Sequence, residues 1–271
     1  MEASAQTAAA SPTRARPGEA TLYVIPGSHA CKTGMLLLEH KGIPYRTVEL
    51  ITGLHPQLVR LHGFRGTREP LRTVDGKPTR MSAMMDRFGT VPAVAIGGER
   101  VQRNREIARY LDELVPDPPL FPPDPELRQR VEEAERFGDE HLQMAARRIV
   151  MVAGARNPDE LAGRGAGGRL GALLSSSDAY RRVMSTVAAR AVFKAGGDAE
   201  GRVMAELPPM LDRVDGWVAD GTLNGDELNV ADLVIAPSLA LLDYRLDLRE
   251  ELRARPSFAL LERVLPEPAA G

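Results

Sequence analysis

A serine and a cysteine three residues apart lie where a strand pattern gives way to a helix pattern. Residues 21–25 form a β-rich run that ends at a Pro-Gly turn, and Ser28-His-Ala-Cys31 follows. A helix N-terminus presents free amides and a partial positive charge, which favour a thiolate. The Ser28 hydroxyl can donate a hydrogen bond to a bound thiol, and Cys31 is expected to have a somewhat lowered pKa. In the alternative interpretation Ser28 only caps the helix and Cys31 is only a small buried residue.

A proline opens a later strand-like segment, Thr90-Val91-Pro92. Proline is normally excluded from central strands, so its presence needs a reason. A cis Val91–Pro92 bond would expose the amide and carbonyl of Val91, and an extended peptide could pair with them. A trans proline on an edge strand is the alternative, and the sequence alone favours trans.

The elements around these residues form an α/β unit. A strand at 21–25, a helix at 28–40 and a strand at 45–50 predict a parallel pair with a right-handed crossover. A strand at 89–96, a Gly-Gly hairpin and a helix with one apolar face complete the pattern. The polar stretch at about 65–87 lacks steady periodicity, and we interpret it as an insertion or lid.

The rest of the chain divides into a tail, a linker and a helical region. Residues 1–20 have the composition of a disordered tail, and a first domain at 21–115 follows. The proline-rich stretch at 116–125 is a linker that no helix crosses. Helices predicted at 126–152, 177–194, 203–220 and 229–242 make 126–266 an all-α domain. Asn229 and Asp232 have the spacing of a capping box, which concerns folding rather than catalysis.

Composition excludes several classes of protein. The 271 residues carry a formal net charge of −2, which argues against a nucleic-acid partner. No apolar run approaches the roughly 18 residues that span a bilayer, so no membrane partner is expected. The single cysteine cannot form an internal disulfide, which fits a cytoplasmic protein. We see neither a metal-binding cluster nor a phosphate-binding loop.

Taken in order, these segments resemble the cytosolic glutathione transferase superfamily over about residues 21–266, with 65–87 as a gap. The resemblance implies a thioredoxin-like α/β domain followed by an all-α domain of the glutathione transferase type. It implies Ser28 as the thiol activator, His55 as a contact of the thiol peptide, and Val91 with cis-Pro92 as a backbone clamp. The Ser-type classes, theta above all, are the most similar. Cys31 is an accessory candidate only, because a dithiol mechanism needs two cysteines.

One departure from the family pattern concerns the thiol. Members usually place an acidic residue and then a serine before the third helix, whereas this chain has Arg103 and Asn104. Asn104 can still donate to a carboxylate, but Arg103 reverses the charge where the ammonium of glutathione would lie. We therefore expect weak binding of glutathione, or another low-molecular-weight thiol without a free ammonium. Alternatively, Arg103 points to solvent.

The resemblance implies an enzyme, a glutathione S-transferase-like homodimer that joins a thiol to an electrophilic small molecule, as in detoxification. The alternatives are a non-catalytic binding or interaction protein of this fold and a glutathione-dependent reductase or isomerase. Met144, Arg147, Arg148 and Met151 lie on the long helix that usually lines the electrophile pocket. The two arginines favour an anionic substrate unless they form a solvated face.

Overall fold

The computed structural model describes residues 18–67, 79–157, 161, 169–171, 178–195 and 199–267. Its first part is a four-stranded sheet in the order β2-β1-β3-β4. The strands are β1 (Ala20–Val24), β2 (Tyr45–Glu49), β3 (Ala93–Ile96) and β4 (Glu99–Gln102). β1 is parallel to β2 and antiparallel to β3, and β3 and β4 form the expected hairpin. The predicted thioredoxin-like arrangement is confirmed.

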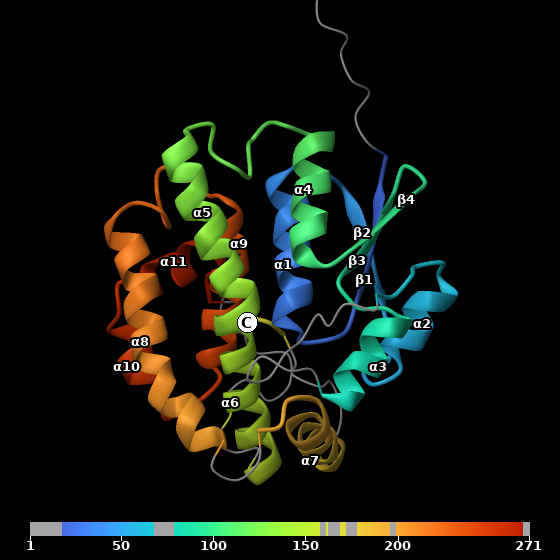
Figure 1. Ribbon diagram of the computed structural model, residues 1–271, viewed down its shortest axis with the longest axis vertical. Coiled ribbons are helices and arrows are strands. Elements are labelled where there is room, and N and C mark those ends of the chain that lie inside the picture. The colour runs from blue at the N-terminus through green and yellow to red at the C-terminus, as the bar shows by residue number, and fades with distance from the viewer. Residues whose placement is uncertain are drawn as a thin grey trace, which may run out of the picture.

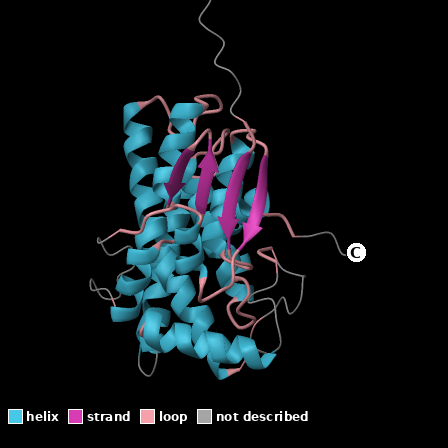
Figure 2. Cartoon of the chain, turned by 90° about the vertical axis from the view of Figure 1, so that its right-hand side faces the viewer, coloured by secondary structure: helices cyan, strands magenta, loops and turns pink. Residues whose placement is uncertain are grey.

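Helices cover both faces of this sheet (Figures 1 and 2). α1 (His29–His40) and α4 (Asn104–Leu114) lie on the face turned to the helical domain, and their apolar side chains join one continuous core. α2 (His55–Leu61) packs on the other face, where Val59 lies in a smaller core with Tyr23 and Phe64. Burial of α1 against the second domain therefore fixes its first turn between the two halves of the chain.

The predicted insertion ends in a helix that the sequence analysis did not expect. α3 (Arg80–Phe88) begins at a capping box formed by Thr79 and Ser82. The Thr79 hydroxyl also donates to the backbone oxygen of Val192, at 3.2 Å, which ties this helix to the second domain. The residues at 68–78 lie outside the described part of the chain, as do residues 1–17 of the predicted tail.

The second domain is built from helices throughout its described residues. α5 (Pro125–Phe137), the π-helical turn η1 (Gly138–Leu142) and α6 (Gln143–Arg156) run on as one long rod. α7 (Asp178–Val187) continues into the π-helical turn η3 (Ala188–Val192). The remaining helices are α8 (Ala199–Ala219), α9 (Val230–Leu242), α10 (Arg249–Arg253) and α11 (Ser257–Val264).

The centre of this domain is α9, whose residues are buried throughout. The predicted capping box starts it: the Asn229 side chain accepts from the amide of Ala231, and Asp232 accepts from the amide of Asn229. Residues 162–168, a glycine-rich part of the sequence, lie outside the described residues. In the part of the chain that is described, no helix is both long and apolar enough to cross a membrane.

Candidate functional site

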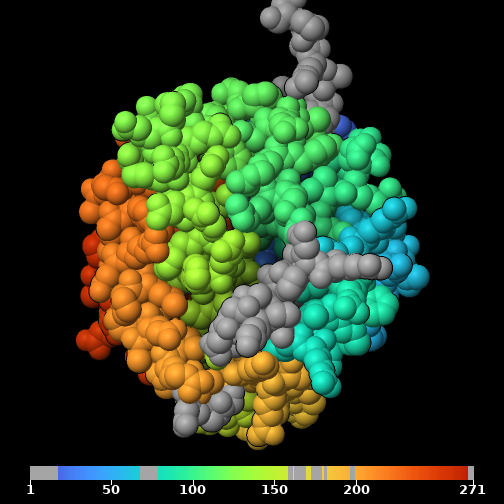
Figure 3. Space-filling model, in the orientation of Figure 1, coloured from blue at the N-terminus to red at the C-terminus, as the bar shows by residue number. Residues whose placement is uncertain are grey.

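A cavity of about 350 Å³ lies between the two domains, beside the first turn of α1. Its walls come from the β1–α1 turn, the start of α2, α3, α6, α7 and η3. Figure 3 shows the face on which α3, α6 and α7 come together. This volume is within the range of small-molecule sites in proteins.

Ser28 lines the cavity at the N-terminus of α1. It is the N-cap residue, and its hydroxyl oxygen accepts from the backbone amide of Cys31 at 3.3 Å. A hydroxyl that accepts one hydrogen bond still has its own hydrogen to donate. The local arrangement thus caps the helix and leaves Ser28 chemically able to donate to a sulfur atom in the cavity.

The Val91–Pro92 peptide bond is cis, as the resemblance implies and against the preference from sequence alone. Val91 lines the same cavity as Ser28, whereas Pro92 is buried beneath it. The ring of Pro92 packs against Gly34 of α1, where a Cβ atom would lie only 3.0 Å from the proline Cβ. The absence of a side chain at Gly34 therefore lets α1 and the clamp lie this close.

His55 begins α2 and also lines the cavity, although it is only 6% exposed. Thr52, Gln57 and Thr90 add further polar groups to the same wall. The sequence analysis named Thr90 only as the start of the Thr90-Val91-Pro92 segment and did not single out Thr52 or Gln57. The structure thus brings Ser28, His55 and Val91 together around one space.

Cys31 differs from the expectation. It is 1% exposed, belongs to the main core and is not among the residues lining the cavity. Burial raises the pKa of its thiol, and this outweighs the opposing effects of a hydrogen bond with the Ser28 side chain and of the Arg147 charge. The expectation of a lowered pKa for Cys31 is wrong because desolvation dominates over the helix end.

Arg103 and Asn104 lie at the start of α4 but have different surroundings. Arg103 has a φ of 70°, and its guanidinium pairs with Glu106 at 2.7 Å. Arg103 and Glu106 line a polar hollow that also includes Arg65 and Asp86. This hollow meets the main cavity at Thr90. The positive charge of Arg103 therefore has an acidic partner that the sequence pattern did not reveal.

Asn104 is buried and lines neither the hollow nor the main cavity. Its amide nitrogen donates to the backbone oxygen of Ala30 at 3.1 Å. Asn104 thus ties the first turn of α4 to the first turn of α1, next to Ser28.

Methionine side chains dominate the apolar part of the cavity. They are contributed by α3, α6 and α7, namely Met81, Met84, Met85, Met151 and Met184. Methionine is flexible and polarizable and therefore adapts to ligands of different shape. The spacing of the three methionines in α3 was visible in the sequence, but their position over the cavity was not.

The four candidates on the long helix separate into two pairs. Arg147 and Met151 line the cavity, as expected for the electrophile pocket. Met144 instead packs against a small core of η3, and Arg148 is buried with a bond to the backbone oxygen of Lys194. Among the described residues, no group of three or more His, Cys, Asp and Glu side chains is placed to hold a metal ion.

Comparisons with known proteins agree with this geometry. Residues 27–114 match the family model described as "Glutathione S-transferase, N-terminal domain". The sequence matches none of the curated proteins.

Solved structures are similar over nearly the entire chain. A glutathione transferase of Phanerochaete chrysosporium has a TM-score of 0.61 at 18% identity, covering 94% of this chain and 99% of that one. A glutathione S-transferase of Ceriporiopsis subvermispora, in complex with glutathione, has a TM-score of 0.58 at 17% identity, covering 93% and 99%. A maleylacetoacetate isomerase of Anaeromyxobacter dehalogenans, with bound glutathione, has a TM-score of 0.50 at 19% identity, covering 91% and 89%.

Proposed function

We propose that this chain, whose residues 27–114 match the N-terminal domain of glutathione S-transferases and whose described residues have a similar fold, is an enzyme that activates glutathione for attack on an electrophilic small molecule. The observation that supports this most directly is the position of Ser28. It caps α1 inside a cavity that His55 and Val91 share.

In this proposal the thiol lies against the N-terminus of α1, with its peptide along Val91. The partial positive charge of the helix end and a hydrogen bond from the Ser28 hydroxyl favour the thiolate. The thiol proton leaves to solvent. The sulfur then attacks the electrophilic carbon, a C–S bond forms, and the leaving group departs with its bonding electrons. The methionine-rich wall holds the apolar body of the electrophile.

The polar hollow gives the thiol peptide a place for its amino-acid end. Glu106 and Asp86 supply negative charge for an ammonium, and Arg65 and Arg103 supply positive charge for a carboxylate. The Arg103–Glu106 pair offsets the charge reversal, which favours glutathione itself over an acylated thiol. Glu106 would then take the part of the acidic residue that is missing at position 103.

Burial of Cys31 counts against the reductase alternative. A cysteine nucleophile must reach its disulfide, and its reactivity needs the thiolate form. Cys31 lies in the core with a raised pKa, so it meets neither condition. An isomerase reaction, in which the glutathione thiolate adds to a double bond and leaves again, uses the same site and remains the second candidate.

The first experiment is titration calorimetry with glutathione, followed by turnover of 1-chloro-2,4-dinitrobenzene. We compare the wild type with Ser28→Ala, which removes the hydroxyl, and with Ser28→Thr, which keeps both the hydroxyl and the cap. Because Ser28→Ala loses one hydrogen bond to the charged thiolate, its kcat/KM should fall about tenfold or more. The threonine variant should retain most of the activity.

The pH dependence separates chemistry from folding. Removing a cap costs about 1 kcal/mol of stability, but it does not by itself move a pH profile. In Ser28→Ala the apparent pKa of bound glutathione, read from thiolate absorbance, should rise. An unchanged pKa with unchanged turnover would contradict the assigned role of Ser28. Absence of glutathione binding by the wild type would favour the non-catalytic alternative.

A second comparison tests the hollow. Glu106→Gln should weaken binding of glutathione more than binding of N-acetylglutathione, because only the former carries the ammonium. Glu113→Gln, on the same helix outside the hollow, is the control. Equal effects on the two thiols would show that Glu106 does not contact the ammonium. We further expect a homodimer, which sedimentation equilibrium would measure.

A further inference from the structure

Arg147 is a charged residue in a cavity whose other walls are mostly apolar. Among the described residues that line the space, it carries the only permanent charge. It comes from α6 of the helical domain, whereas Ser28 comes from the first domain. A charge that lies against apolar walls loses part of its hydration, and an anionic ligand can offset the free energy lost in this way.

The charge of Arg147 acts close to Ser28. It lowers the pKa values of His29 and Cys31, which are both buried in the first turn of α1. Burial lowers the pKa of His29, and the Arg147 guanidinium lowers it further. Arg147 lines the same cavity as Ser28 and His29, so its guanidinium and the first turn of α1 border one space.

Asp139 of η1 is an acidic residue whose pKa is raised by burial and lowered in part by the Arg147 charge. It does not line the cavity. A guanidinium has five N–H donors arranged in a planar fork. Arg147 can thus interact with an acidic neighbour on one side and donate to a ligand on the other.

We infer that Arg147 binds an anionic group, such as a carboxylate, on the electrophile, so that the cavity selects apolar electrophiles carrying one negative charge. This inference rests on the proposed transfer reaction at Ser28 and names the substrate class of that site. The planar fork matches a carboxylate in geometry as well as in charge. The methionine wall accommodates the rest of the molecule.

The test compares two electrophiles of the same shape, one with a carboxylate and one with an uncharged amide: 4-chloro-3,5-dinitrobenzoate and 4-chloro-3,5-dinitrobenzamide. In each, the thiolate sulfur bonds to the ring carbon that carries chlorine, and chloride leaves with the bonding pair. The carboxylate or amide is not consumed. The measured quantity is the acid-to-amide ratio of kcat/KM at saturating glutathione, compared between variants so that intrinsic reactivity cancels.

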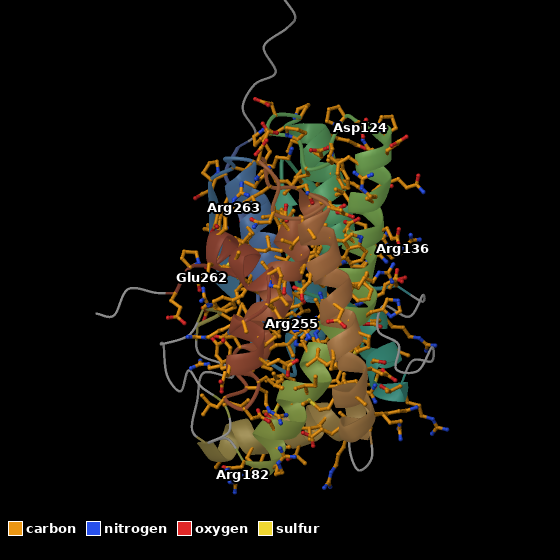
Figure 4. All side chains as sticks on the ribbon, turned by 90° about the vertical axis from the view of Figure 1, so that its left-hand side faces the viewer. Asp124, Arg136, Arg182, Arg255, Glu262 and Arg263 are labelled. Atoms are coloured by element: carbon orange, nitrogen blue, oxygen red, sulfur yellow. The ribbon has the colours of Figure 1, made fainter. Side chains whose placement is uncertain are left out.

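The ratio should fall about tenfold in Arg147→Met, which is the size expected for losing one charge pair in a partly exposed site. Arg147→Lys keeps the charge and should retain much of the preference. Arg182→Met is the matched control, since Arg182 is exposed on α7 and projects from the outside of the molecule (Figure 4). It should leave the ratio unchanged.

Binding of unreactive analogues separates this inference from the proposed reaction. Calorimetry with 3,5-dinitrobenzoate and 3,5-dinitrobenzamide needs no turnover. A benzoate preference that Arg147→Met abolishes supports the anion site even if no transfer is detected, in which case only the proposed reaction fails. Equal affinity of the wild type for both analogues, or an equal loss of both in Arg147→Met, would overturn the inference.

Discussion

Replacing Gly34 by alanine should destabilise the protein and disturb the thiol site, although alanine is the better helix former. Gly34 lies inside α1 and faces the cis-proline segment. A Cβ atom there would lie 3.0 Å from Cβ and 3.3 Å from Cγ of Pro92, and 3.4 Å from Cδ1 of Leu22. The first two contacts are closer than side-chain atoms ordinarily approach.

Two opposing effects decide whether Gly34→Ala raises or lowers the free energy of unfolding. Alanine in place of glycine within a helix stabilises by about 0.5–1 kcal/mol. Forcing a methyl group into a packed site costs about 1–3 kcal/mol. The neighbours cannot yield easily, because the Pro92 ring has no free rotation and Leu22 is fully buried in β1. The expected net change for Gly34→Ala is therefore a loss of about 1–2 kcal/mol.

Urea unfolding measures this change, with Gly216→Ala as the matched control. Gly216 is exposed in α8 and a Cβ there would meet nothing within 4 Å, so that variant should gain about 0.5–1 kcal/mol. Gly34→Ala should also bind glutathione more weakly, because Val91 shifts with Pro92. If both alanine variants are stabilised equally, the close approach of α1 to the clamp does not constrain the fold and the reasoning fails.

Three further outcomes are expected. Cys31 should react slowly with iodoacetamide in the native protein, because burial raises its pKa, and fast alkylation would contradict its position in the core. Glu135→Ala should cost about 1–3 kcal/mol in urea unfolding, since the buried carboxylate accepts two bonds from Arg109 at 2.8 and 2.9 Å, whereas Glu133→Ala at an exposed pair should cost little. Burial raises the pKa of Asp232 to about 6, above its unfolded value. The stability that this group contributes is therefore fully present below about pH 4 and is lost as the pH rises through about 6. Calorimetric melting of the wild type and Asp232→Asn across that range checks the sign, because the difference in Tm between them should change with pH.

Elements encoded by short-range rules were predictable. The strand, turn and helix around Ser28 follow from a β-rich run, a Pro-Gly turn and a capping serine. The Gly97-Gly98 hairpin and the Asn229 capping box follow from turn and cap chemistry in the same way. Each depends on hydrogen bonds and backbone geometry within a few residues, so the local sequence contains the necessary information.

The helix α3 shows where such rules were insufficient. Its Thr79 cap and its methionine spacing are local signals, yet the polar stretch before it gave no periodicity. Its position over the cavity depends on the contact between Thr79 and Val192, which are far apart in the sequence. Long-range packing of this kind cannot be deduced from the spacing of residues in one segment.

The sequence by itself determined the order of the main elements other than α3, the cap at Ser28 and the family resemblance. Only the tertiary structure decided that Arg147 faces the cavity while Arg148 is buried, that Arg103 pairs with Glu106, and that Cys31 lies in the core. The physical reason is that secondary structure follows from neighbours along the chain. Desolvation and charge pairing instead depend on which distant segments enclose a group, and that is fixed only when the chain has packed.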